Sequence, residues 1–458
     1  MLLNFKLQNF LSFRKEVEFT TLASRELQHK ERVFRQPGLA LSVLPVAAFY
    51  GGNGAGKSNF YSALKFAKRF ILRGRARPED AIDVEPFRLD DEYINKPTSF
   101  SFDIMVAKAV YRYSFAVTHA RVLLESLAEV KGERETPVFT RNGEGEKPVW
   151  NVDYFKRLDL ANDELQFIEF KTRDTLPNQL FLSEVRGRKV PIVEAVGDWF
   201  QSKLVLLDPH SAFKPVAIGL RQVESFREYS VRALERAGTG ISGLENETVS
   251  LENLPLPGGL KRIIERQLET SKEGEMLQVV DPEERQRFFV FREAGKTQVL
   301  QLVTYHDDRA GRKVRFEMPD ESEGTRRLID LLPAFFELSS PDTEKVFFID
   351  EIDRSLHTHL TRGLLESFLE TRTIKSKGQL FFTTHDGMLL DQSLLRRDEI
   401  WFFDKNQHGE SELSALSDFK GVRNDKDIRK SYLLGRFGGV PEMRPMPRRT
   451  TDNTEVSR

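Results

Sequence analysis

The sequence lacks cysteine, an excess of either charge, and any long apolar run. None of its 458 residues is cysteine, which excludes disulfide scaffolds, thiolate-ligated zinc, iron–sulfur clusters and a cysteine nucleophile. The 69 Lys and Arg residues balance 70 Asp and Glu residues, so the net charge of −1 indicates no global electrostatic partner. No stretch approaches the roughly 20 apolar residues of a membrane span, and the N-terminus has no apolar core typical of a signal peptide. We therefore expect a cytoplasmic protein of two or three domains with no membrane partner.

A glycine-rich segment at residues 51–58 carries the strongest chemical signal. It reads GGNGAGKS and matches the phosphate-loop pattern G-x-x-x-x-G-K-[ST]. An almost continuously apolar run precedes it and predicts a buried strand, and residues 58–72 repeat apolar side chains at helical spacing. Strand, glycine-rich turn and helix together predict a backbone whose N–H groups face the phosphates of ATP. The residues expected to bind the nucleotide are Gly51, Asn53, Gly54, Ala55, Gly56, Lys57, Ser58 and Asn59.

Two of these residues have a more specific expected role. The Lys57 ammonium is expected to reach the β- and γ-phosphates, and the Ser58 hydroxyl to bind Mg²⁺.

A second motif, at residues 346–351, adds the acidic groups that such a site needs. Four apolar residues predict a buried strand, and Asp350 and Glu351 follow at its carboxyl end, where α/β sheets place their ligands. Asp350 is expected to orient the Mg²⁺ shell, and Glu351 to act as general base on the attacking water.

Two weaker signals lie near this acidic strand in the sequence. Ser322 and Gly324 stand where a helix is expected to begin, which is a favourable place for an anion. His385 follows the next buried strand, within reach of a γ-phosphate bound at the first motif. Helices and buried strands alternate from residue 321 to 404, which predicts a mostly parallel sheet covered by helices.

The order of these motifs resembles the ABC-type ATPase heads of the SMC, RecF and OLD group. Within that group the sequence is similar to the compact ABC-like AAA ATPases of bacterial phage-defence systems. The opening LQNFLSFRKEVEF, the S-x-G-T and TTH segments, and the C-terminal LLRRDEIWFFDKN carry this resemblance besides the phosphate loop. It implies an α/β fold: a P-loop NTPase head with a mixed sheet covered by helices, interrupted by a mostly helical insertion.

The resemblance also implies roles for individual residues. Ser322 and Gly324 become the signature motif, which reaches the γ-phosphate held by Lys57 of a second subunit, so the protein is expected to be at least a dimer. Glu351 becomes the catalytic glutamate, Asp353 the acid that couples the two sites, and His385 the switch histidine. ATP and Mg²⁺ are the implied ligands.

Some residues depart from the family pattern. Glu321 and Glu323 flank Ser322 and would place two carboxylates near a triphosphate unless Arg326 and Arg327 offset them. No residue is identifiable as the glutamine of the family's glutamine loop. We expect the first lobe of the head at residues 1–130, an insertion for oligomer or partner contacts at 131–290, the second lobe at 291–442, and a disordered tail at 443–458.

Three classes of function fit these features. The first is an ATP-driven sensor and scaffold that holds a separate TOPRIM-like nuclease effector and releases it when a phage-encoded trigger protein is sensed. The second is a RecF-like repair ATPase that binds DNA directly, which the balanced charge disfavours. The third is the nucleotide-binding subunit of a transporter, which the N-terminal block and the missing glutamine loop disfavour. The first is preferred, because no further set of carboxylates in the sequence is typical of a nuclease.

Two other patterns are interpreted as structural. The basic stretches Lys65–Arg77, Arg312–Arg315 and Arg444–Arg449 are balanced by acidic runs and are expected to be solvated surface. His357 and His359 are expected to point to opposite sides of a helix start and to bind no metal.

Overall fold

The core of the molecule is a six-stranded sheet in which only the last strand is antiparallel. The computed structural model describes residues 1–36, 38, 41–73, 77–143, 146–158, 160, 162–187, 190–254, 256–270, 276–280, 287–293, 295–421 and 427–439. In sheet order the strands are β11 (Leu204–Leu207), β17 (Val346–Ile349), β18 (Gln379–Thr383), β5 (Val46–Gly51), β19 (Ile400–Lys405) and β20 (Ser411–Ala415). The strand that leads into the phosphate loop, β5, therefore lies between two strands that come more than 300 residues later.

Adjacent phenylalanines fill both faces of this core sheet. Phe348, Phe381 and Phe403 belong to the hydrophobic core on one face, whereas their neighbours Phe347, Phe382 and Phe402 belong to the core on the other face. Successive side chains of a strand point to opposite faces, so a doublet supplies one ring to each layer. These doublets thus supply aromatic side chains to the hydrophobic cores on both faces of the sheet.

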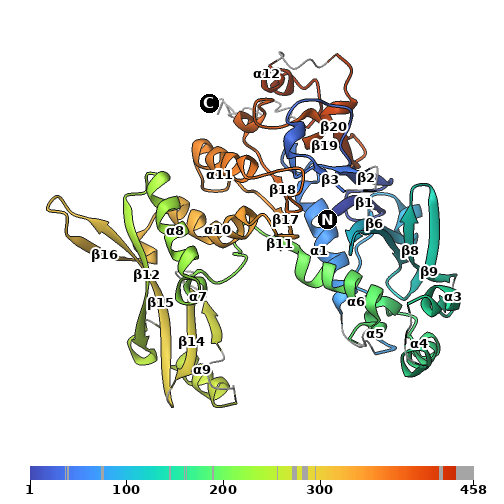
Figure 1. The fold of residues 1–458 in the computed structure, drawn as a ribbon, viewed down its shortest axis with the longest axis horizontal. Helices are drawn as coiled ribbons and strands as arrows, with labels where there is room; N and C mark the ends of the chain where they lie inside the picture. Colours follow the sequence, from blue (N-terminus) through green and yellow to red (C-terminus); the bar gives the residue numbers. More distant parts are fainter. Residues whose placement is uncertain are drawn as a thin grey trace, which may run out of the picture.

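A seven-stranded antiparallel sheet packs over one face of the core, with helix α1 between the two sheets. In sheet order its strands are β10 (Val149–Trp150), β9 (Arg134–Asn142), β8 (Val122–Lys131), β7 (Ala109–Val117), β6 (Thr98–Val106), β1 (Leu2–Gln8) and β2 (Val17–Thr20). Helix α1 (Lys57–Leu72) contributes Phe60 and Leu64 to the shared core, and Figure 1 shows it, in blue, beside both sheets. Strand β9 lies just beyond the boundary expected at residue 130, so the first lobe of the head extends past it.

The opposite face of the core sheet is covered by α10 (Glu323–Ser339) and α11 (Thr358–Glu370). Residues 152–203 add a group of short helices that pack on the α1 side through Phe181 and Trp199. These are α3 (Val152–Lys156), α4 (Asn162–Asp174), α5 (Phe181–Val185), α6 (Pro191–Asp198) and a π-helical turn at Trp199–Lys203. The described chain closes with α12 (Ile428–Leu433).

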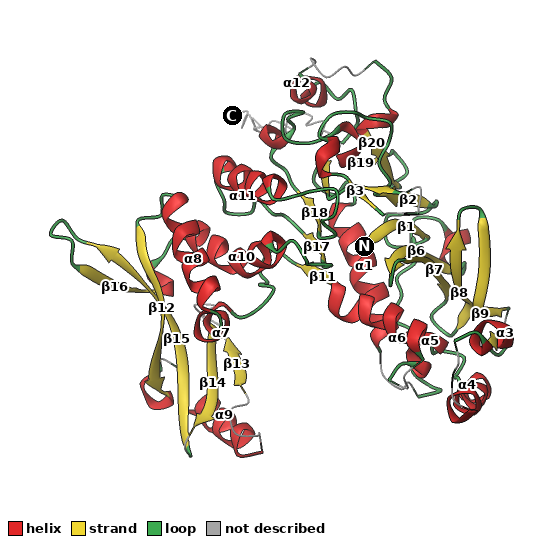
Figure 2. Ribbon diagram, viewed as in Figure 1, coloured by secondary structure: helices red, strands yellow, loops and turns green. Residues whose placement is uncertain are grey.

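A third, five-stranded antiparallel sheet stands beside the head. Its strands are β12 (Ile241–Ser250), β13 (Met276–Val280), β14 (Arg287–Glu293), β15 (Lys296–Asp307) and β16 (Lys313–Glu317), with β15 paired to β12, β14 and β16. Helices α7 (Val216–Gln222) and α8 (Glu224–Arg236) join it to α10, while α9 (Gly258–Thr270) packs on β14. Figure 2 shows this third sheet to the left of the head, across α8 and α10.

This arrangement differs from the organisation expected for residues 131–290. The segment includes β11, which is an edge strand of the core sheet, as well as β12, β13 and most of β14 in the third sheet, so it combines helices with strands. The expected boundary at residue 290 falls inside β14. The expected disordered tail at 443–458 lies outside the described residues. None of the described helices is both long enough and apolar enough to span a bilayer.

Candidate nucleotide-binding site

The phosphate loop connects the carboxyl end of β5 to the first turn of α1. Gly54 and Gly56 have φ angles of +77° and +123°, a region that favours glycine. A Cβ atom on Gly56 would lie 2.5 Å from the Ser411 hydroxyl oxygen, so a larger residue does not fit there. The loop therefore curls with its backbone at the N-terminus of a 16-residue helix, an arrangement that favours phosphate.

The Lys57 side chain is buried and folds back over the loop. Its ammonium donates hydrogen bonds to the carbonyl oxygens of Gly51, at 2.6 Å, and Gly52, at 3.2 Å. Burial lowers the pKa of Lys57, and the nearby carboxylates of Asp350 and Glu351 oppose this shift. The loop thus holds a cation near the carboxylates that follow β17, and its expected contact with the phosphates stays a prediction.

Asp350 ends β17 and is brought to the start of α1. The Thr383 hydroxyl donates a 2.6 Å hydrogen bond to its Oδ1, and the Ser58 hydroxyl lies near the same carboxylate. Burial raises the pKa of Asp350, while these two hydroxyls and Lys57 oppose the increase. A carboxylate beside a serine hydroxyl is an oxygen-donor pair that suits Mg²⁺, so Ser58 and Asp350 fit the metal role expected for them.

Glu351 occupies a backbone conformation that is unusual for a residue other than glycine. Its φ angle is +50°, which costs on the order of 1–3 kcal/mol, and its N–H donates a 2.7 Å hydrogen bond to the Thr383 hydroxyl oxygen. The carboxylate remains one-third exposed, with an Arg354 nitrogen 3.8 Å away. Thr383, which sequence reasoning missed, therefore fixes both acidic residues. Its only signal was its place at the end of a buried strand.

Asp353 and His385 meet beside the same edge. The His385 backbone N–H donates to Asp353 Oδ2 at 3.2 Å, whereas Oδ1 is buried and has no hydrogen-bond partner among the described residues. Partial burial and the nearby Lys57 charge lower the pKa of the His385 imidazole. This places an open acceptor and an uncharged imidazole near Lys57 at neutral pH.

Ser322 and Gly324, the two residues expected to form the signature motif, lie at the start of α10. The Ser322 hydroxyl caps the helix by accepting a 3.1 Å hydrogen bond from the Thr325 N–H. Gly324 packs so tightly that a Cβ atom would lie 2.5 Å from the Ser355 carbonyl oxygen. Among the described residues, no hydrogen bond joins either of them to the phosphate loop. The structure therefore gathers Lys57, Ser58, Asp350, Glu351, Asp353 and His385 at one edge and leaves the signature pair apart.

The charged neighbours of Ser322 differ from the expectation. Glu321 is 8% exposed and turns into the third sheet, where Thr304 and His306 contact its carboxylate. Arg327 is also buried and donates to the Ser211 carbonyl oxygen at 3.1 Å. Of the two acids, only Glu323 is exposed. The expectation that both carboxylates lie beside a triphosphate is therefore wrong.

The sheet edge carries one further acidic residue. Asp208 follows β11, and the Leu207 carbonyl oxygen accepts a 2.9 Å hydrogen bond from the Asp350 N–H. The sequence did not reveal Asp208, because a four-residue strand within a loop-rich segment has too short a pattern to detect.

The expected geometry of His357 and His359 is wrong. Their rings stack with centroids 5.2 Å apart, because His357 is the extended N-cap of α11 and accepts the His359 N–H at 3.2 Å. That capping bond occupies His357 Nδ1. Within the described ranges, no group of three or more His, Asp or Glu side chains is arranged to hold a metal ion.

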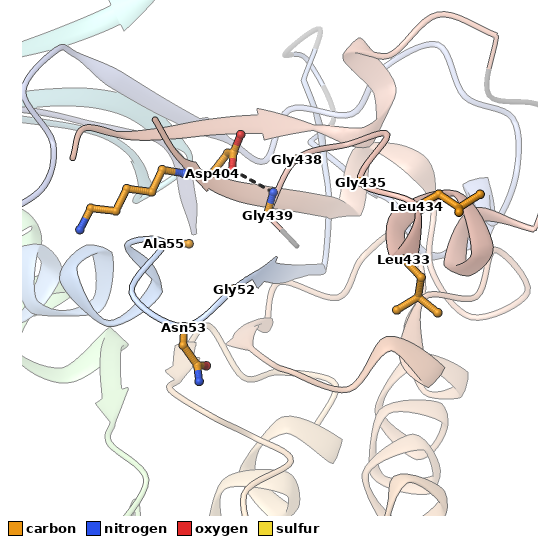
Figure 3. Close-up of a pocket in the computed structure, with 10 residues that line it drawn as sticks. Gly52, Asn53, Ala55, Asp404, Leu433, Leu434, Gly435, Gly438 and Gly439 are labelled. Carbon is orange, nitrogen blue, oxygen red and sulfur yellow. Dashed lines mark hydrogen bonds between the residues drawn. The ribbon is translucent and has the colours of Figure 1, made fainter. Parts of the chain in front are cut away.

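A cavity of about 710 Å³ adjoins the outer side of the phosphate loop. Figure 3 shows Asn53 and Ala55 on one wall and the Gly435–Gly439 segment on the other, with Asp404 accepting the Gly439 N–H at 3.0 Å. A Cβ atom on Gly439 would lie 3.3 Å from the Gly51 Cα, so the end of the described chain packs directly on the start of the loop.

The fold and this site define an ABC-like AAA ATPase domain of the P-loop class. The chain belongs to the family described as "AAA domain, putative AbiEii toxin, Type IV TA system", whose profile matches residues 46–184 and 221–391. These ranges include the phosphate loop, the signature segment, the acidic strand and His385. No curated protein matches the chain.

Solved structures with similarity to the chain include two SMC heads. The SMC head domain from Thermotoga maritima is 12% identical, with a TM-score of 0.36, over 90% of this chain and 98% of that one. The SMC head bound to the C-winged helix domain of ScpA is 13% identical, with a TM-score of 0.37, over 90% and 97%. Because both scores are low, the family assignment rests on the matched domain and on the site.

Proposed function

We propose that this protein hydrolyses ATP to ADP and phosphate. The observation that carries the proposal is the meeting of Lys57, Asp350, Glu351 and His385 at the carboxyl edge of one sheet. Phosphoryl transfer depends mainly on positioning and on charge stabilisation, and these side chains supply both.

Each residue has a role that follows from its surroundings. Lys57 exchanges its bonds to loop carbonyls for bonds to phosphate oxygens, and Ser58 and Asp350 would hold Mg²⁺, which would supply charge neutralisation at the phosphates. Glu351 accepts a proton from the water that attacks the γ-phosphorus, and the bond from that phosphorus to the ADP oxygen breaks. His385 contributes a hydrogen bond instead of a charge, because its lowered pKa leaves it neutral at pH 7.

Completion of the site requires a second copy of the chain. Ser322 and Gly324 make no described contact with their own phosphate loop, which supports the proposal that they act on nucleotide held by another subunit. ATP would then lie between two subunits of a homo-oligomer, with Asp353 coupling the two sites.

We further propose that ATP turnover controls a separate toxic effector in antiphage defence. The support is the motif order, which resembles AriA of the PARIS system, together with a family description that names a toxin–antitoxin system. In this proposal the ATPase scaffold holds a TOPRIM-like nuclease and releases it when a phage-encoded protein is sensed.

The alternative of direct action on DNA has less support from the surface. In the basic stretch of α1, Arg69 pairs with Asp83 at 3.0 Å and Arg73 with Asp80 at 3.1 Å. Arg315, in the second stretch, pairs with Glu247 at 2.8 Å. Such paired cations offer few free charges to a phosphate backbone. The third stretch, Arg444–Arg449, lies outside the described residues.

Steady-state ATPase assays on the Lys57→Ala variant test the enzymatic proposal. We expect hydrolysis to be lost and ATP affinity to fall by about 100-fold, because a buried cation that meets the phosphates is removed. Lys65→Ala, an exposed lysine on the same helix, is the matched control and retains activity. Equal ATP affinity in Lys57→Ala and wild type would refute the phosphate-site assignment.

Co-purification from the native operon tests the defence role. We expect an effector encoded next to this gene to be retained by the wild-type protein and released when the phage trigger is co-expressed. Tight binding to duplex DNA at physiological salt, with no co-purifying effector, would instead favour the repair ATPase.

A further inference from the structure

Glu321 connects the signature segment to the third sheet. It directly precedes Ser322, the N-cap of α10, and its side chain points away from the exposed start of that helix. The Thr304 hydroxyl donates to Glu321 Oε1, and His306 Nε2 lies 2.8 Å from the same oxygen. With 8% of its surface exposed, the carboxylate is held by two side chains of one strand.

The strand that holds Glu321 is firmly anchored. Thr304 is fully buried, and in β15 it stands opposite Leu244 of β12 on one side and Phe316 of β16 on the other. The His306 ring also packs on the Phe316 ring, with centroids 4.6 Å apart. Because β15 is paired on both sides at this point, it offers a rigid reference for the start of α10.

On its other side, the start of α10 contacts the backbone that follows the catalytic acids. Gly324 meets the Ser355 carbonyl oxygen with no room for a Cβ atom. Ser355 itself has a φ angle of +59°, and it lies in the turn that carries Glu351 and Asp353. A displacement at Glu321 would therefore reach both the signature residues and this turn.

We propose that Glu321 is a positioning residue for ATP hydrolysis, which ties Ser322 and Gly324 to β15 so that the third sheet sets where the signature segment stands. The inference rests on the proposed ATPase function. It assigns the third sheet a mechanical role, because anything that moves β15 relative to the head also moves the signature segment and the turn beside it.

The first test compares Glu321→Ala and Glu321→Gln with wild type. Removal of the anchor is expected to lower kcat by about 10-fold or more while the Kd for ATP at the phosphate loop stays within about 2-fold. The glutamine variant keeps an acceptor for Thr304 and is expected to recover most of the activity. Glu245→Gln, an exposed acid on β12, is the matched control.

A double-mutant cycle with His306→Ala tests whether the two side chains act as one unit. If Glu321 acts through β15, the kcat of the double variant equals the kcat of the less active single variant. If the two effects are independent, their activation free energies add and the fold-decreases in kcat multiply, which would overturn the proposal. A loss in ATP affinity as large as the loss in kcat would also overturn it. If Glu321→Ala does not fold, His306→Ala still tests the contact, because it removes the partner side chain instead of Glu321.

Hydrogen–deuterium exchange supplies a readout that does not require hydrolysis. In Glu321→Ala we expect faster exchange at residues 322–327 and 353–356, with no change at 57–64. Unchanged exchange at the start of α10 would overturn the positioning role even if wild type proves to be an active ATPase. Conversely, wild type without ATPase activity but with the expected exchange pattern would reject only the proposed function.

Discussion

Thr383 is the residue that the two acidic groups of the site share. One hydroxyl donates to Asp350 and accepts from the Glu351 N–H, so its rotamer fixes a carboxylate and the following backbone at once. Both acids could be predicted from the sequence because they follow an apolar run, but a threonine at the end of a strand does not by itself indicate a functional role. Residues that act through hydrogen bonds across neighbouring strands become visible only when the strand order is known.

Glu399 is a buried acid whose charge state should couple stability to pH. It is 1% exposed, and burial raises its pKa from 4.5 to about 8. The native state therefore binds a proton more tightly than the unfolded chain does. This stabilisation is complete below about pH 4.5 and is lost as pH rises through about 8.

Glu399→Gln is expected to remove this dependence, because the amide mimics the protonated acid and keeps an acceptor for the Arg396 N–H. Urea unfolding at about pH 5 and about pH 8.5 would show the free energy of unfolding of wild type falling relative to the variant. Glu412→Gln, on the exposed side of β20, should run parallel to wild type. A constant difference between wild type and Glu399→Gln would contradict the prediction.

At the scale of elements, the start of α10 is held by a backbone contact. In Gly324→Ala the new methyl group meets the Ser355 carbonyl oxygen at 2.5 Å, and backbone cannot rotate away as a side chain can. A shift of α10 by about 1 Å is expected to lower kcat by about 100-fold. ATP binding by the phosphate loop should persist, which equilibrium titration with a fluorescent ATP analogue can measure.

The matched control for this prediction is Gly363→Ala in α11. A Cβ atom there meets nothing within 4 Å, so the substitution should stabilise the helix by about 0.5–1 kcal/mol and leave turnover unchanged. Full activity in Gly324→Ala would show that the position of α10 is not critical.

Local patterns identified the elements of the head well. The phosphate loop, α1, β17, β18 and α10 all form where glycine spacing or apolar periodicity indicated them. Strand β12 was missed, because its exposed positions Glu245 and Thr248 lie in a largely polar sequence. Strands β15 and β16 fall in the range expected for the second lobe but pair in the third sheet, since the sequence alone gives no information on which strands pair.

At the scale of the whole molecule, the proposed sharing of the site between two subunits predicts an ATP-dependent assembly. Glu351→Gln should bind ATP without hydrolysing it and accumulate as a closed oligomer, seen as at least a doubling of mass by light scattering. The physical reason is that, in the proposed assembly, the bound nucleotide would bridge Lys57 of one copy and Ser322 of another.

The double variant Lys57→Ala, Glu351→Gln is the control, because it lacks the phosphate contact and should stay in its nucleotide-free state. If Glu351→Gln instead remains monomeric with ATP, the signature residues do not act across subunits. If it hydrolyses ATP at the wild-type rate, Glu351 is not the base.

The position of β5 in the sheet also has a consequence for synthesis. Residue Ala47 stands opposite Phe381, and Tyr50 stands opposite Phe402, so both neighbours of this strand come from the last fifth of the sequence. A nascent chain emerging from the ribosome carries the phosphate loop long before its sheet exists. Both edges of β5 then remain unpaired until translation is nearly finished, a state prone to aggregation. From the strand order alone, we expect the chain to need chaperones during synthesis. We also expect any chain that ends before β18 to lose nucleotide binding.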